Sequence, residues 1–334
     1  MFLAPGAGST LILGERKEGM MAAGLRNILV GVSLTPENDR VVQAGFALAA
    51  TSGAKIHLLH VLPAAELLGG PFGYEWIQYQ AVEELKADRQ RTLEARLKEV
   101  QKPIQAGFAL VEQGAPHRAL LDAARRLEAG LLVVGATEGK NAFDRLLGST
   151  ADRVLRRATC PVLVVRGDLS VPLRRVLMPV DLSPLSAESF QAGLQLLTLL
   201  GESPTSEALF VLSQLQRELA YQFSPAQMER FATEELRRFV ERRGTVGPKD
   251  VEIRVRTGVP HQEILTELVE RPADVVVLGT HGRGGFERFL LGSVAADVVR
   301  AAPCSALVSP PAAAREAERA EGGQPPSEGS YRFG

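Results

Sequence analysis

The stretch Leu131-Leu-Val-Val-Gly135 returns 144 positions later as Val275-Val-Val-Leu-Gly279. Each copy is a short apolar run that ends in glycine, which is typical of a buried strand in a parallel sheet. The same offset of 144 positions separates three further pairs of landmarks: Pro116 and Pro260, Ser149 and Ser293, and Cys160 and Cys304. A period of this length indicates a duplicated domain, because solenoid repeats are only about 20 to 50 residues long.

Short apolar strands alternate with helical segments in both copies. Strands are expected in the first copy at residues 27–33, 55–62, 104–112, 131–135 and 162–165. Strands are expected in the second copy at residues 176–180, 208–212, 251–256, 274–279 and 305–308. Strands that alternate with helices form a parallel sheet with both faces covered. The sequence therefore predicts an α/β fold of two tandem, doubly wound, Rossmann-like domains.

The repeat and the local composition together give expected domain boundaries. The first domain is expected over residues 25–166 and the second over residues 175–310, with a linker at 167–174. Residues 1–24 are expected to be a leader that is either disordered or not part of the native protein. Residues 311–334 are rich in Ala, Glu, Gly and Pro, so a disordered tail is expected there.

The short linker predicts that the two copies pack closely. Val162–Val165 is an apolar strand whose edge has to be covered. We expect it to lie beside Ser305–Val308 of the same chain, which would make an intrachain pseudo-dimer. Association with a second copy of the chain, or with another protein, stays open.

Composition excludes several classes of partner. Hydrophobic residues make up 45% of the 334 residues and charged residues 23%, as in soluble globular proteins. The net charge of -1 gives no strong attraction to nucleic acid or to anionic membranes. No run approaches the ~18 to 20 apolar residues of a membrane span. Two cysteines are too few for a disulfide framework, which favours a reducing, cytoplasmic location.

The strongest candidate site is Gly279-Thr-His-Gly282, followed after nine residues by Gly292-Ser293. It begins where a strand ends, and open parallel sheets bind ligands at that edge. Glycines allow backbone N–H groups to approach a ligand closely, and the start of a helix attracts anions. A phosphate chain between two glycine turns is one interpretation. The other is that the glycines only form tight turns.

This spacing resembles the ATP-binding motif of the universal stress protein family, over roughly residues 27–165 and 175–308. The resemblance implies ATP as the ligand, alone or with Mg²⁺, and a nucleotide contact from an Asp after the first strand, here Asp181. The implied binding residues are Pro179, Val180, Asp181, Leu278, Gly279, His281, Gly282, Arg283, Gly292, Ser293 and Val294. From the residues alone, Asp181 is equally well explained as a turn residue before Ser183-Pro184.

The first copy departs from the motif at two positions. Ser33 stands in place of the acid after the first strand, and Glu138 in place of the second glycine. A carboxylate repels phosphate, so the first copy is expected to have lost ATP. The second copy also departs from the first at the end of its second strand, where Val211-Leu-Ser-Gln is expected to replace Leu59-His60-Val61.

The histidines indicate no metal site, and no catalytic residue is recognisable. His57 and His60 are three apart on a strand and should point to opposite faces. His117 and His261 follow the prolines that open helices and are expected to be exposed.

Three functions remain open at this point. The first is an ATP-binding regulatory protein of the stress-response type, with one nucleotide site in the second copy. The second is a nucleotide-free interaction module on the same scaffold. The third is a slow ATP-hydrolysing enzyme, which the missing base and nucleophile disfavour.

Overall fold

The computed structural model describes residues 25–35, 39–63, 75–99, 104–136, 147–199, 204–213, 222–242, 251–280 and 291–311. The expected leader and all but the first residue of the expected tail lie outside these ranges. Within them, no helix combines the length and the apolar character that crossing a membrane requires.

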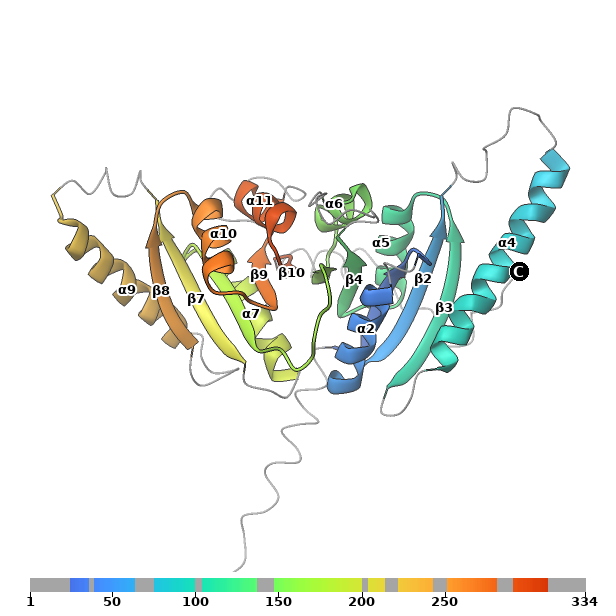
Figure 1. The fold of residues 1–334 in the computed structure, drawn as a ribbon, viewed down its shortest axis with the longest axis horizontal. Helices are drawn as coiled ribbons and strands as arrows, with labels where there is room; N and C mark the ends of the chain where they lie inside the picture. Colours follow the sequence, from blue (N-terminus) through green and yellow to red (C-terminus); the bar gives the residue numbers. More distant parts are fainter. Residues whose placement is uncertain are drawn as a thin grey trace, which may run out of the picture.

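One continuous sheet of ten strands runs through the molecule (Figure 1). Its strands are β1 Asn27–Val32, β2 Lys55–Leu62, β3 Gln105–Gln113, β4 Leu131–Gly135, β5 Val162–Val165, β6 Arg175–Val180, β7 Thr205–Leu212, β8 Val251–Thr257, β9 Val275–Gly279 and β10 Ser305–Ser309. Their order is β3-β2-β1-β4-β5-β10-β9-β6-β7-β8. All pairs within each copy are parallel. The predicted α/β fold with two tandem, mostly parallel halves is confirmed.

Helices cover both faces of this sheet. They are α2 Asp39–Ser52, α4 Glu75–Lys98, α5 Pro116–Arg126, α6 Ser149–Leu155, α7 Pro184–Leu199, α9 Pro225–Glu241, α10 Pro260–Glu270 and α11 Ser293–Ala301. Side chains of α2, α4, α7 and α9 join the core on one face, and those of α5, α6, α10 and α11 join the core on the other. Residue alternation in β1 supplies both cores, with Ile28 and Val30 in the first and Leu29 in the second.

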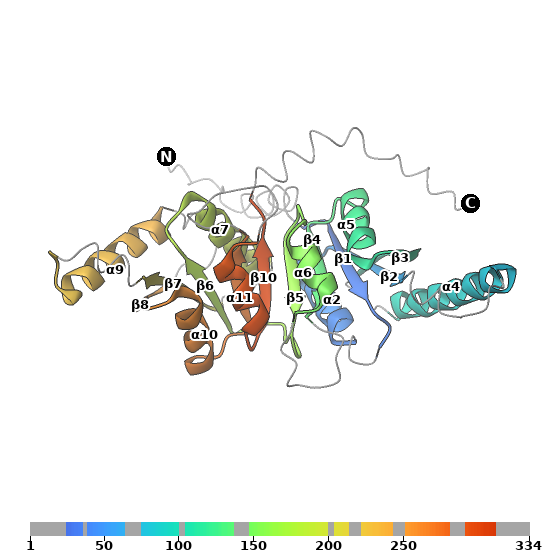
Figure 2. The ribbon, with the colours of Figure 1, turned by 90° about the horizontal axis from the view of Figure 1, so that it is seen from above.

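The two copies meet through their last strands, as the sequence predicts. β5 and β10 pair antiparallel, with Val162 opposite Val308 and Val164 opposite Ala306. Figure 2 shows the two strands side by side at the centre of the molecule. Each copy covers the other's exposed strand edge, and both hydrophobic cores therefore continue across the junction.

Candidate functional site

The candidate site lies where β6 and β9 part. The two strands are paired only at Val176 with Val275 and at Leu177 with Val276, although both continue for three more residues. Pro179 lies in β6 just beyond the last pair, and it has no N–H to donate to a neighbouring strand. In the second copy, β7 and β8 lie on one side of β6, and β9 and β10 lie on the other. Open α/β sheets bind ligands at such a point, where the strand order reverses.

Asp181 follows β6 directly and takes part in a turn. Its Oδ1 accepts the backbone N–H of Ser183 at 2.9 Å, and Ser183 Oγ accepts the N–H of Ser186 at 3.1 Å. These bonds connect the end of β6 to the first turn of α7. The turn explanation of Asp181 is therefore observed, and the carboxylate is fixed at the carboxyl edge of the sheet. Asp181 is half-buried.

The two ends of the glycine motif are joined by one backbone hydrogen bond. Thr280 follows β9 and donates its N–H to Ser309 O at 3.2 Å, while Gly292 N donates to Thr280 O at 2.7 Å. A Cβ added at Gly292 would lie 3.3 Å from Thr280 O, which is tighter than most Cβ contacts. Glycine therefore permits the chain that leaves β9 to return to the same point and begin α11. Thr280, an unspecified position within the motif, holds this closure, and the motif alone did not indicate it.

The first turn of α11 carries the donors that an anion would use. Gly292 is the N-cap residue and provides no side-chain cap, while Gly292 O accepts the N–H of Ala296 at 2.9 Å. The first N–H groups of a helix have no partner inside the helix, and the helix dipole is positive at that end. Ser293 is exposed and Val294 is half-buried at this turn.

Eight of the eleven predicted binding residues are described, and they come together at one edge. Pro179, Val180 and Asp181 lie at the end of β6, and Leu278 and Gly279 at the end of the adjacent β9. Gly292, Ser293 and Val294 begin α11 beside Thr280. His281, Gly282 and Arg283 lie outside the described residues, so their predicted contacts stay predictions.

The first copy keeps the same backbone arrangement. Gly148 is the N-cap of α6, and its N–H donates to Ala136 O at 2.6 Å, as Gly292 does to Thr280. The difference lies in the side chains. After β1, Ser33 Oγ is hydrogen-bonded to Thr35 Oγ1 at 3.2 Å, where the second copy has Asp181. Glu138 lies outside the described residues.

The register corrects the predicted correspondence at the second strands. β1 pairs Val32 with His60, and β6 pairs Val180 with Phe210. Leu209-Phe210-Val211 therefore corresponds to Leu59-His60-Val61, and the predicted Val211-Leu-Ser-Gln was wrong by two residues. His60 is buried and its Nδ1 is 2.7 Å from Val32 O. The error arises in the connection between the first and second strands, because apolar periodicity does not fix the length of a connection.

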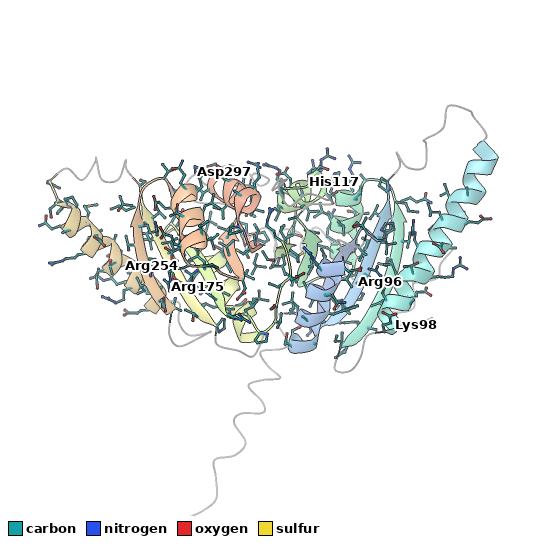
Figure 3. All side chains as sticks on the ribbon, viewed as in Figure 1. Arg96, Lys98, His117, Arg175, Arg254 and Asp297 are labelled. Carbon is teal, nitrogen blue, oxygen red and sulfur yellow. The ribbon has the colours of Figure 1, made fainter. Side chains whose placement is uncertain are left out.

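The predicted exposure of His117 was also wrong. Only 7% of His117 is exposed, and burial lowers its pKa, with a further contribution from the nearby Arg153. His261, its counterpart, is half-buried, with Nδ1 4.0 Å from Asp297 Oδ2. Figure 3 labels His117 and Asp297 at the edge of the sheet where the strands end. His117 lies in α5, which packs against α6, a contact that the sequence does not reveal.

Comparison with known proteins gives consistent matches over both copies. The model of the universal stress protein family matches residues 24–166 and again residues 172–310. A universal stress protein of Mycolicibacterium smegmatis is 29% identical over 307 residues, which is 85% of this chain and 97% of that protein. Universal stress protein A homolog 1 of Coxiella burnetii is 28% identical over 141 residues, which is 42% of this chain and 95% of that protein.

One solved structure shows the same fold, and a second matches a shorter part of the chain. A universal stress protein from Archaeoglobus fulgidus covers 85% of this chain and 98% of its own, with a TM-score of 0.57 and 19% identity. Another universal stress protein, solved in complex with cAMP, covers 43% of this chain and 98% of its own, with a TM-score of 0.31 and 25% identity.

Proposed function

This chain belongs to the universal stress protein family, and from that membership we propose that it is a regulatory protein that binds one ATP, in its second copy. The observation that carries a nucleotide site is the bond from Gly292 N to Thr280 O at 2.7 Å, and the choice of the second copy rests on Asp181, where the first copy has Ser33. It brings the uncapped first turn of α11 to the end of β9, beside the place where β6 and β9 part. Backbone donors and a helix N-terminus thus face one edge, as a phosphate chain requires.

The geometry fits a triphosphate in one further respect. A Cβ at Gly292 would crowd Thr280 O, so this turn depends on a residue without a side chain. A bare backbone at a helix start can approach phosphate oxygens closely. ATP brings its own Mg²⁺ in solution, and we expect the triphosphate, with or without the ion, to lie against the first turn of α11.

Asp181 is proposed to contact the sugar side of the nucleotide. Its Oδ1 is held by the N–H of Ser183, which fixes the carboxylate at the end of β6. A carboxylate accepts hydrogen bonds from hydroxyl groups, and ribose supplies two. Because such charge-assisted bonds contribute about 1.5 to 3 kcal/mol, Asp181→Ala should weaken ATP binding by roughly tenfold to hundredfold.

The decisive experiment is calorimetric titration with ATP of the wild type, Gly282→Val and Glu138→Val. The wild type should bind one ATP per chain. Gly282→Val should abolish binding, because the motif predicts a residue without a side chain at this position and a branched side chain would obstruct the phosphates. A strained backbone at that residue would cost about 1 to 3 kcal/mol, so circular dichroism should remain like that of the wild type. Glu138→Val, the matched change in the first copy, should leave binding unchanged.

Two results would reject this proposal. Equal affinity in wild type and a folded Gly282→Val would make the motif a turn and favour the interaction module. Two equivalent sites per chain would remove the asymmetry between the copies. Parallel titrations with AMP and cAMP, which each carry one phosphate, should give weaker binding than ATP. Prolonged incubation with labelled ATP tests the enzyme alternative, because a binding protein returns the label intact.

A further inference from the structure

Arg166, which follows β5 of the first copy, reaches across the junction to α11 of the second. Its backbone N–H donates to Ser305 Oγ at 3.1 Å. Its guanidinium Nη2 donates to Val299 O and to Arg300 O, each at 3.2 Å. These two carbonyls belong to the last turn of α11. One side chain of the first copy therefore binds the C-terminal end of a helix in the second.

The reciprocal contact cannot form. The offset of 144 positions that relates the copies maps Arg166 onto Pro310 and Ser305 onto Pro161. Proline has neither a guanidinium nor an N–H, and Pro161 has no hydroxyl to accept one. The C-terminal end of α6 consequently receives no guanidinium from the second copy at this position. The connection runs in one direction, from the copy with the degenerate motif to the copy with the complete one.

The helix that Arg166 binds is the one that begins with Gly292-Ser293. The last carbonyls of a helix have no partner inside the helix, and the dipole is negative there. A guanidinium that donates to two of them satisfies these acceptors and opposes fraying. At 1.5 Å per residue, the six to seven residues from Ser293 to Val299 and Arg300 place this contact about 10 Å from the proposed phosphate end. Because so short a helix moves as a unit, holding one end also fixes the other.

We propose that Arg166 is a positioning residue through which the first copy holds α11 in the orientation that binds ATP. This inference rests on the proposed ATP site of the second copy. The first copy thus takes part in nucleotide binding without a nucleotide of its own.

The test compares ATP affinity in Arg166→Met, Arg166→Lys and Arg157→Met. Methionine keeps an apolar stem but has no donor, so Arg166→Met should raise the Kd for ATP by about twofold to fivefold. Lysine restores a cation at the helix end and should recover part of the loss. Arg157→Met is the matched control, because Arg157 is an exposed arginine that follows α6. It should leave the Kd unchanged.

Hydrogen exchange separates positioning from mere stability. In the wild type, ATP should slow exchange of the residue 166 amide, which donates to Ser305, and of the Ala302 amide, which donates to Val298 O. In Arg166→Met this slowing at residue 166 should be lost. An unchanged Kd in Arg166→Met, even with reduced stability, would overturn the inference while leaving the ATP site intact. A wild type that binds no ATP would instead reject the proposed function.

Discussion

The two copies carry different chemistry at the strand ends opposite the candidate site. In the first copy, Asn27 Nδ2 donates to Leu127 O at 2.7 Å, and Asn27 Oδ1 is 3.2 Å from His57 Nε2. The register places Arg175 and Glu207 of the second copy at the positions of Asn27 and His57. There Arg175 donates to Arg271 O and to Glu207 Oε2, the latter at 2.6 Å.

The comparison shows which part of this arrangement the fold requires. Leu127 and Arg271 are the C-cap residues of α5 and α10, so both copies supply a donor from the first strand to a carbonyl at a helix end. The charge of the network is not required. Where the first copy has a neutral histidine, the second has the fully buried Glu207 and Glu267 surrounded by arginines, of which Figure 3 labels Arg175 and Arg254.

The largest effect should come from removing a buried carboxylate of the second copy. Glu207→Ala leaves Arg175 and Arg271 without the carboxylate oxygen that they share, at 2.6 and 2.7 Å. Breaking a buried ion pair from one side typically costs about 3 to 5 kcal/mol, and we expect that loss in the free energy of unfolding. Urea denaturation followed by circular dichroism measures it.

The control for that substitution is Glu252→Ala. Glu252 also pairs with Arg271, at 2.9 Å, but 52% of its side chain is exposed. Exposed pairs contribute less than about 1 kcal/mol. If Glu207→Ala and Glu252→Ala destabilise the protein equally, the buried carboxylate contributes no more to stability than the exposed one.

The neutral network should make the first copy sensitive to acid. Burial, and secondly the charge of Lys55, lower the pKa of His57 to about 4. Between pH 6.5 and 4 the unfolded chain binds a proton at this residue and the folded chain does not. Stability from this residue is therefore complete above pH 6.5 and is lost as the pH falls toward 4, by up to about 3 kcal/mol.

Urea denaturation followed by circular dichroism at each pH measures this dependence. His57→Gln keeps hydrogen-bonding groups but removes the titration, so its unfolding free energy should depend less on pH over this interval. Carboxylates titrate in both proteins, so their contribution cancels in the difference between the two unfolding free energies. Parallel pH curves for the two proteins would contradict the assignment to His57.

A smaller effect should separate two corresponding glycines. Gly114 has a φ of +123° with nothing near its Cβ position, and Gly258 has a φ of +155°. A Cβ at Gly258 would lie 2.5 Å from Glu263 Oε1, and Glu263 accepts a hydrogen bond from Arg256. Strain should cost each alanine variant about 1 to 3 kcal/mol, with Gly258→Ala the more destabilised. Thermal unfolding measures which alanine variant is less stable. If Gly114→Ala is the less stable, backbone strain alone, and not the contact with Glu263, decides the loss of stability.

The smallest effect concerns α9, which begins with a capping box. Ser224 Oγ accepts the N–H of Gln227 at 3.3 Å, and Gln227 Oε1 accepts that of Ser224 at 2.8 Å. Ser224→Ala should cost about 1 kcal/mol, because one helix donor loses its partner. Urea denaturation should show this small loss, whereas Thr233→Ala, a change at a half-buried position in the middle of the same helix, should cost less. Equal losses would mean that the cap adds nothing.

Local patterns in the sequence determined much of this molecule. Apolar runs and the offset of 144 positions gave the strands, the duplication and the parallel α/β architecture. The predicted pairing of Val162–Val165 with Ser305–Val308 is confirmed. The glycine motif indicated the edge at which Asp181, Gly279 and Gly292 come together. These features depend on residues close in sequence, or on the repeat itself, which is visible without a structure.

Only the tertiary structure decided which distant side chains became neighbours. Arg175 and Glu267 are far apart in the chain, yet they pair at 3.2 Å because β6 and α10 both contact β7. His117 is buried in α5, which packs against α6, and Arg166 meets α11 because β5 pairs antiparallel with β10. Charged residues carry no periodic signal of burial. Their environment is set by how helices pack on the sheet, and a linear pattern does not contain that information.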